Sequence, residues 1–154
     1  MILILIFFAV VNSKTICDDL DGKIRDGVLF LKESKKPYTG KSLCIWDINN
    51  TVWYEGNYKD GHRDGFWIGW HDNGAKQGEV TWLNGMEDGL WVIWHENGKK
   101  MREVHWLDGK RDGKCQEWYE NGTRKLEGFW KQGSKNGKWN YWYENGKKIK
   151  EEIH

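Results

Sequence analysis

The sequence has few prolines, few cysteines and almost no net charge, and each of these features excludes a class of structure or function. One proline in 154 residues, Pro37, leaves no room for stiff Pro-rich linkers, and the length suits one domain. A formal net charge of +1 gives no excess of Lys and Arg to attract nucleic acid. Cys17, Cys44 and Cys115 show no Cys-x-x-Cys spacing, so they signal neither a zinc site nor a redox motif. One disulfide could form in an oxidising compartment, leaving one thiol over.

Long hydrophobic runs are also missing, apart from one at the start. Residues 1–11 are nearly all apolar, but a transmembrane helix needs about 20 such residues. The run has the length of a signal-peptide core, and residues 11–13 offer a cleavage site, so we expect residues 1–13 to be a signal peptide. This predicts an exported protein, whether secreted, periplasmic or at the cell surface. The alternative is an N-terminal strand in a cytoplasmic protein. Lipidation of Cys17 is left open, although residues 14–16 match a lipobox poorly.

Glycine and tryptophan, in contrast, are abundant, and both recur with one period. There are nineteen glycines and twelve tryptophans, and residues of each kind return every 24 positions. The tryptophan column is Trp46, Trp70, Trp94, Trp118 and Trp142, and one glycine column is Gly65, Gly89, Gly113 and Gly137. A glutamate column follows the same spacing at Glu55, Glu79, Glu103, Glu127 and Glu151. Such self-similarity is the signature of a repeat architecture.

Turn chemistry predicts the structure of one unit. Asn-Gly and Asp-Gly between runs of β-branched and aromatic residues are a strong hairpin signal, because tight turns need positive φ. We predict two strands and two turns per unit, and a glycine about every ten residues would interrupt any helix. The fold class is therefore all-β: a single-layer, twisted antiparallel meander of about five 24-residue hairpin repeats, open rather than closed into a barrel. We expect the tryptophans of the column to stack on their copies in neighbouring units.

The two ends of the chain should differ from the repeats. Residues 14–39 are expected to form an N-terminal capping segment with a strand around residues 28–31, and residues 40–154 the repeat array. The unit from Gly40 has one extra residue before Trp46, which predicts a bulge there. Which columns share a face stays open, because a two-residue turn at Asn73-Gly74 and a longer turn give opposite parities.

The segment from Tyr54 to Gly65, YEGNYKDGHRDG, closely resembles the MORN repeat. The 24-residue unit ending in WHENG or WYENG, preceded by the YTGK segment at residues 38–41, resembles the MORN variant of the YwqK-family antitoxins. The resemblance implies an all-β ribbon that works by binding, without a cofactor. An antitoxin would hold a cognate toxin inactive.

Catalytic chemistry is not signalled. No Gly-x-Ser-x-Gly, phosphate loop or Cys/His pair is present, so we expect no enzyme, no metal site and no cofactor. His71 and His95 occupy a column that continues as tyrosine, which we interpret as an aromatic position beside the turn. The glutamate column should be a solvated sheet position, paired with lysines across the strand. Its members should lie two strands apart, too distant to share a metal ion.

The leading functional hypothesis is therefore a protein-interaction ribbon whose partner could be a toxin, with no nucleic acid and no membrane contact beyond the signal segment. Aromatic residues anchor interfaces well. We predict the contact strip on one side of the odd-numbered strands, at Trp67, His71, Trp91, His95, Tyr119, Trp139 and Tyr143; simple packing between strands would explain the same residues. A carbohydrate or cell-wall binding repeat, or one that binds a lipid surface, is the alternative.

Overall fold

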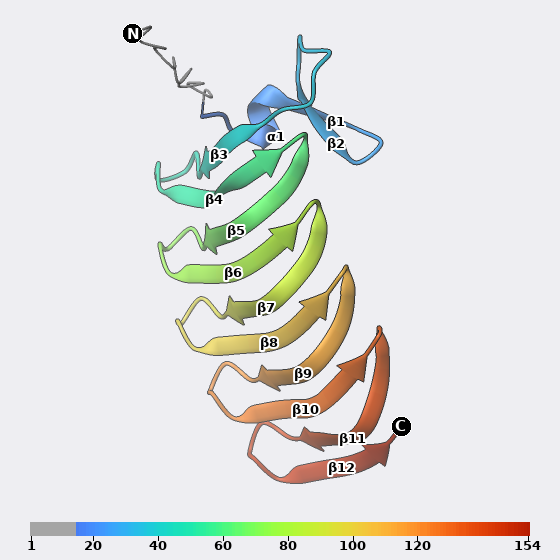
Figure 1. The fold of residues 1–154 in the computed structure, drawn as a ribbon. Helices are drawn as coiled ribbons and strands as arrows, with labels where there is room; N and C mark the ends of the chain where they lie inside the picture. Colours follow the sequence, from blue (N-terminus) through green and yellow to red (C-terminus); the bar gives the residue numbers. More distant parts are fainter. Residues whose placement is uncertain (1–14) are drawn as a thin grey trace, which may run out of the picture.

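A ten-stranded antiparallel sheet makes up most of the molecule, and the computed structural model describes residues 15–154 (Figure 1). Its strands pair in strict chain order, so the fold is an open, all-β meander, as predicted. The strands are β3 (Gly40–Ile45), β4 (Val52–Lys59), β5 (His62–Trp70), β6 (Lys76–Leu83), β7 (Met86–Trp94), β8 (Lys100–Leu107), β9 (Lys110–Trp118), β10 (Arg124–Lys131), β11 (Ser134–Trp142) and β12 (Lys148–Ile153). The expected signal peptide, residues 1–13, lies outside the described residues. No helix in the described part of the chain is long and apolar enough to cross a membrane.

Two kinds of turn alternate along the ribbon. At one side, tight turns such as Asp60-Gly61 join the strands, with φ of 49° and 79° at the two central residues. Positive φ at both positions is the type I′ geometry, which suits the twist of a hairpin. At the other side a longer connection runs from Trp70 to Lys76, closed by a hydrogen bond that the His71 N–H donates to the Ala75 oxygen. The Asn-Gly turn is thus the longer of the two alternatives.

Each strand that follows a tight turn is bent at the glycine that recurs every 24 residues. In β7, Gly89 has φ of +73°, and residues 89–91 all lie opposite the single residue Val80 of β6. Two extra residues keep the in-and-out alternation on both sides of the irregularity while they bend the strand. The bend repeats in every unit, and the sheet therefore curves into a trough (Figure 1).

The predicted irregularity before Trp46 is present, between Cys44 and Ile45, but the same irregularity recurs in the following units and does not come from the extra residue. Ile45 pairs with Val52 as Trp70 pairs with Lys76, so Ile45 and not Trp46 occupies the Trp70 position. The extra residue is absorbed in the connection, where the Trp46 N–H bonds to the Thr51 oxygen. Trp46 therefore shifts by one place into the position of His71.

The predicted stacking of the tryptophan column on its copies in neighbouring units is wrong. Among residues 15–154 no ring contact joins two members of that column, and all five members are only half-buried. The fully buried rings belong to other columns, such as Trp67 at 4% exposure and Trp139 at 2%. The bend at the glycines brings these rings over the sheet, whereas the column before Asn-Gly lies beside the connections at the edge.

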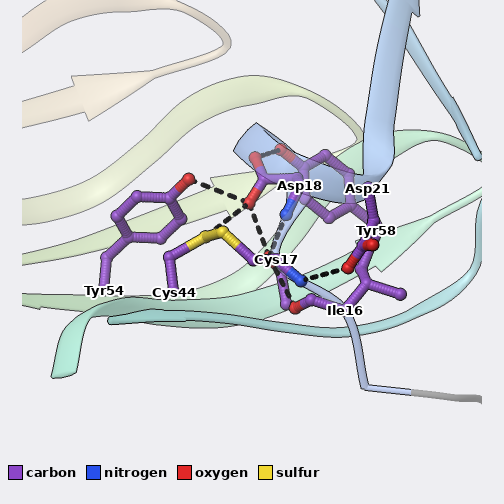
Figure 2. The surroundings of a disulfide bond; sticks show 8 residues. Ile16, Cys17, Asp18, Asp21, Cys44, Tyr54 and Tyr58 are labelled. Carbon is purple, nitrogen blue, oxygen red and sulfur yellow. Dashed lines mark hydrogen bonds between the residues drawn. A yellow bond between two sulfur atoms is a disulfide. The ribbon is translucent and has the colours of Figure 1, made fainter. Parts of the chain in front are cut away.

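The N-terminal segment caps the first strand of the sheet. It contains helix α1 (Asp18–Asp21) and a separate hairpin of β1 (Gly22–Arg25) and β2 (Val28–Leu31), which includes the predicted strand. A disulfide joins Cys17 to Cys44 of β3, and Cys115 is the remaining, buried thiol (Figure 2). The Asp18 carboxylate accepts hydrogen bonds from the Tyr54 and Tyr58 hydroxyls at 3.0 and 2.7 Å. This cluster fastens the cap to β4.

Candidate functional site

The register separates the side chains into two faces. On one face lie the buried rings and two shallow hollows, the first lined by Arg63 and Trp82 and the second by Arg111 and Lys135. We call this the groove face. On the other face, which we call the salt-bridge face, the glutamate column crosses the sheet in one row, with a residue such as Val92 between successive glutamates. These pairings show which of the repeated columns share a face, which the sequence leaves open.

The floor of the groove is a row of indoles lying flat on the strand behind them. The rings of Trp67 and Trp139 cover Gly56 and Gly128, where a Cβ atom would approach the ring carbons to 2.1 and 2.3 Å. Each ring also donates its indole N–H to a backbone oxygen, that of Asn57 for Trp67 at 3.2 Å. Equivalent bonds fix Trp91 and Trp139. These side chains are therefore rigid parts of the scaffold.

Cys115 takes the place of the indole in the third unit. Val104 pairs with Cys115, at the position that holds Gly56 in the first unit, Val80 in the second and Gly128 in the last. Cys115 and Val104 are both buried, at 6% and 4% exposure. Burial raises the pKa of the Cys115 thiol, so it stays protonated at neutral pH. The thiol is a small apolar filler in this setting.

A row of charged side chains, which we call the groove row, stands two positions after each tight turn. Its members are Arg63, Glu87, Arg111 and Lys135. The Arg63 guanidinium carbon lies 4.7 and 5.4 Å from the ring centres of Trp67 and Trp82. Arg111 is held in the same way between Trp106 and Trp130, at 5.5 and 5.0 Å. Cations between indole faces are attracted to the rings and lose their freedom to reorient.

The first three members of the groove row have no charged partner. Within residues 15–154 neither Arg63, Glu87 nor Arg111 forms an ion pair, whereas Lys135 lies 3.5 Å from Glu152 and also donates to the Tyr141 hydroxyl. Arg63 donates only to the hydroxyl of Tyr58, at 3.4 Å. Two cations and one anion thus line the groove without neutralisation by the described chain.

The salt-bridge face is the opposite case. Every glutamate of the column is ion-paired: Glu55 with Lys41, Glu79 with Lys76, Glu103 with Lys100, Glu127 with Lys114 and Arg124, and Glu151 with Lys138 and Lys148. Hydrogen bonds from Lys138 and Lys148 lower the pKa of Glu151 to about 2. The predicted pairing with lysines across the strands is found for Glu55, Glu127 and Glu151, whereas Glu79 and Glu103 pair with a lysine of their own strand. Three exposed apolar side chains, Phe66, Leu90 and Phe129, stand on this face as well.

The connections at the edge form a ladder from unit to unit. The side-chain oxygen of Asn97 accepts the Lys99 N–H and closes its own turn, while its amide donates to the Glu120 oxygen one unit further, at 2.8 Å. Asn73 and Asn121 make the same pair of bonds, and the Asn49 amide donates to the Asp72 oxygen. Only asparagine supplies both an acceptor and a donor here. This is a second reason for the repeated Asn-Gly.

The residues predicted as a contact strip divide between these two places. Trp67, Trp91 and Trp139 are the floor of the groove, and the first and last are too buried to touch a partner directly. The others lie in the ladder: the His71 Nε2–H donates to the Trp94 oxygen at 3.0 Å, and His95 and Tyr119 reach the Trp118 and Trp142 oxygens in the same way. Tyr143, half exposed, stands at the last turn. The predicted strip is therefore not one surface.

The groove row was missed from the sequence. Its column carries both signs of charge, Arg, Glu, Arg and Lys, so no single residue type recurs there. The two signals that could have found it are its constant place after the tight turn and the aromatic column Tyr58, Trp82, Trp106 and Trp130 that faces it across each hairpin.

The fold and the groove together define the class of protein. It is an open β-hairpin repeat protein, in which each unit adds two strands to the sheet and one charged position to the groove row. Three segments of the chain, residues 87–108, 111–132 and 135–154, match the family model described as MORN repeat variant. Each matched segment covers one strand pair, β7–β8, β9–β10 or β11–β12. Repeats of this kind suggest a domain that interacts with proteins or with membranes. No curated protein matches the chain.

Proposed function

We propose that the chain is a non-enzymatic protein-binding domain that holds a partner protein in its groove. The observation that carries the proposal is the contrast between the faces. Ion pairs neutralise the whole glutamate column on the salt-bridge face, while Arg63, Glu87 and Arg111 stay unpaired on the groove face. Charged side chains held rigidly beside indoles can bind a complementary partner with little loss of entropy.

The groove suits a protein segment better than a small molecule. Its two hollows have volumes of about 430 and 150 Å³ and are open to solvent along the trough. Small-molecule sites bury most of their ligand in one concave pocket, whereas a long groove with repeated chemistry fits a chain. A carbohydrate chain is the competing occupant, because sugars also pack on exposed rings, but a neutral chain offers no charges to the groove row and an acidic chain offers no cation to Glu87.

We extend the proposal to the class of partner. The resemblance of the repeats to YwqK-family antitoxins supports a toxin as the partner, which the ribbon would hold inactive. The Cys17–Cys44 disulfide supports export, since disulfides persist in oxidising compartments. Together with the apolar run at residues 1–11, it favours a partner met outside the cytoplasm.

Affinity capture from the native host tests this function. The full chain would be used as bait, any protein that stays bound would be identified and purified, and its affinity measured by calorimetry. The double variant Arg63→Ala/Arg111→Ala should weaken binding at least about tenfold, which corresponds to about 1.4 kcal/mol. The control Leu90→Ser/Phe129→Ser, on the salt-bridge face, should bind as the wild type does. Loss of binding in the control alone would refute the groove as the site.

Two further measurements separate the alternatives. Growth of cells that express the captured protein with and without the chain tests neutralisation: an antitoxin restores growth, and unchanged growth refutes that role. Sedimentation with purified cell wall and with anionic liposomes tests the carbohydrate and lipid alternatives. A protein-specific binder should stay in solution in both.

A further inference from the structure

The groove row has a fixed spacing that a bound segment would have to match. Successive members lie one unit apart, which is two strands, or about 9.6 Å at ~4.8 Å per strand. Arg63 and Arg111 are therefore about 19 Å apart, with Glu87 midway. An extended peptide in the polyproline II conformation advances about 3.1 Å per residue with three residues per turn, so one unit of the groove corresponds to about three residues of ligand, and every third side chain lies on the same side of it.

We propose that the groove binds an extended segment of the partner protein that runs across the strands and carries a matching pattern of charge. The segment has two acidic residues about six positions apart, one at Arg63 and one at Arg111, and a lysine or arginine midway at Glu87. This inference rests on the proposed function and names the kind of segment that the groove selects.

The contacts within the groove favour acidic residues at the two arginines. Each guanidinium lies against two indole faces, and the Arg63 Nε–H donates to the Tyr58 hydroxyl, so the terminal N–H groups are the ones that can make paired bonds to a carboxylate. Arg63 and Arg111 each line one of the two hollows, so each acidic side chain has a place to enter. Lys135 needs no such partner, because Glu152 already neutralises it.

Recognition by side chains is also what the sheet allows. Each strand from β4 to β11 has a paired neighbour on both sides, so none of them offers a free edge along the groove to which a partner strand could be added. A segment that crosses the strands must therefore be held by its side chains. Charges of alternating sign then fix both its register and its identity, because a shifted segment would place like charges together.

Labelled synthetic peptides test the charge pattern directly. The patterned probe has eleven residues, with Asp at positions 3 and 9, Lys at position 6, and Ser, Tyr and Leu elsewhere. The inverted probe exchanges Asp and Lys and keeps every other residue. Fluorescence anisotropy at low salt gives the affinity of each probe for the full chain. The wild type should bind the patterned probe at least about tenfold more tightly than the inverted probe.

The charge-swapped variant Arg63→Glu/Glu87→Lys/Arg111→Glu should reverse this preference. The matched control Lys59→Glu, at an exposed lysine on β4, changes the net charge by the same amount and should keep it. Circular dichroism shows whether the swapped chain is folded; if it is not, the single variants Arg63→Gln and Arg111→Gln should each weaken the patterned probe about threefold. Equal binding of the two probes to the wild type, or an unchanged preference in the folded variants, would overturn the charge register.

The failure of this inference can be told from failure of the function. If a captured partner binds through the groove, as the alanine variants would show, but the patterned probe does not compete with it, the charge register is wrong and the protein-binding function stands. If the captured partner is insensitive to the groove variants, the function assigned to the groove fails as well.

Discussion

The fit between Gly128 and Trp139 gives the sharpest test of the structural account. The Trp139 indole covers Gly128 so closely that a Cβ atom there would lie 2.3 Å from a ring carbon. One unit earlier the same two positions hold Val104 and Cys115, both buried. Glycine with a fully buried tryptophan and valine with a small side chain are therefore two ways to fill one space, whereas Trp91, which lies opposite Val80 in the second unit, is only half-buried. We predict that Gly128→Val expels the indole, and that removing the indole relieves the clash.

The magnitude follows from the burial of the ring. Trp139 is 2% exposed, and the loss of a buried tryptophan typically costs about 3–5 kcal/mol of unfolding free energy. Gly128→Val should cost about the same, because the ring can no longer lie on the strand. In Gly128→Val/Trp139→Ala the valine occupies the vacated space, so the double variant should cost about as much as Trp139→Ala alone. The coupling energy then equals the cost of Gly128→Val alone, about 3–5 kcal/mol in magnitude.

Urea denaturation of the four chains, followed by circular dichroism, measures this cycle. Alanine is preferred to cysteine at position 139 because it adds no thiol. A uniform urea dependence across the four chains would show that they unfold by the same transition. Additive costs, with a double variant destabilised by the sum of the two single changes, would refute the packing described for this pair. So would a Gly128→Val chain as stable as the wild type.

Three further predictions concern the cap and the ladder. Cys17→Ser, which opens the disulfide loop of the cap, should lower the unfolding free energy by about 3 kcal/mol in denaturant titrations, and an equal loss on adding reductant to the variant would contradict this cause. Burial raises the pKa of Tyr58 to about 12, above the ordinary tyrosine value of about 10, so its contribution to stability is present below pH ~10 and is lost as the pH rises towards 12. Melting between pH ~9 and ~12 should show a smaller fall in stability for Tyr58→Phe than for the wild type, and an equal fall would exclude this residue as the cause. Asn97→Asp loses the amide donor to the next unit but keeps the oxygen that accepts the bond within its own turn. It should lower the unfolding free energy in urea titrations by about 1 kcal/mol more than Asn145→Asp in the last turn, where only the acceptor bond to the Lys147 N–H is made. Equal costs of the two variants would exclude the ladder as a source of stability.

The period of 24 residues predicts the strands and the order in which they pair, because each tight turn and each connection carries its own glycine. It cannot predict the faces. The irregularity at Gly89 adds two residues to β7, so side chains on both sides of it keep the same alternation between the two faces. The irregularity at Trp94 adds a single residue, Met101, to the partner strand β8, so the alternation of faces there is shifted by one position. Both look the same in the sequence, and only the hydrogen-bonded register distinguishes them. Trp46 was misplaced for the same reason.

The candidate site was less predictable than the fold. A large aromatic side chain suggests a contact surface, yet Trp67 and Trp139 are buried by a bend that the sequence does not reveal. Arg63 and Arg111 become candidates for binding only because they have no ion pair within the described residues, whereas every glutamate of the column on the salt-bridge face has one. Pairing between strands depends on register, and a sequence lists charged residues without showing which of them are neutralised.

The indole N–H signals of the twelve tryptophans offer the most direct test of the groove as the binding surface. In a two-dimensional nitrogen–proton spectrum of the chain labelled at tryptophan, the captured partner would be added stepwise. We predict shifts for Trp82, Trp106 and Trp130, which hold the arginines of the groove row, and little change for Trp94 and Trp142, over which Lys76 and Arg124 of the salt-bridge face lie. Shifts confined to Trp94 and Trp142 would contradict the account.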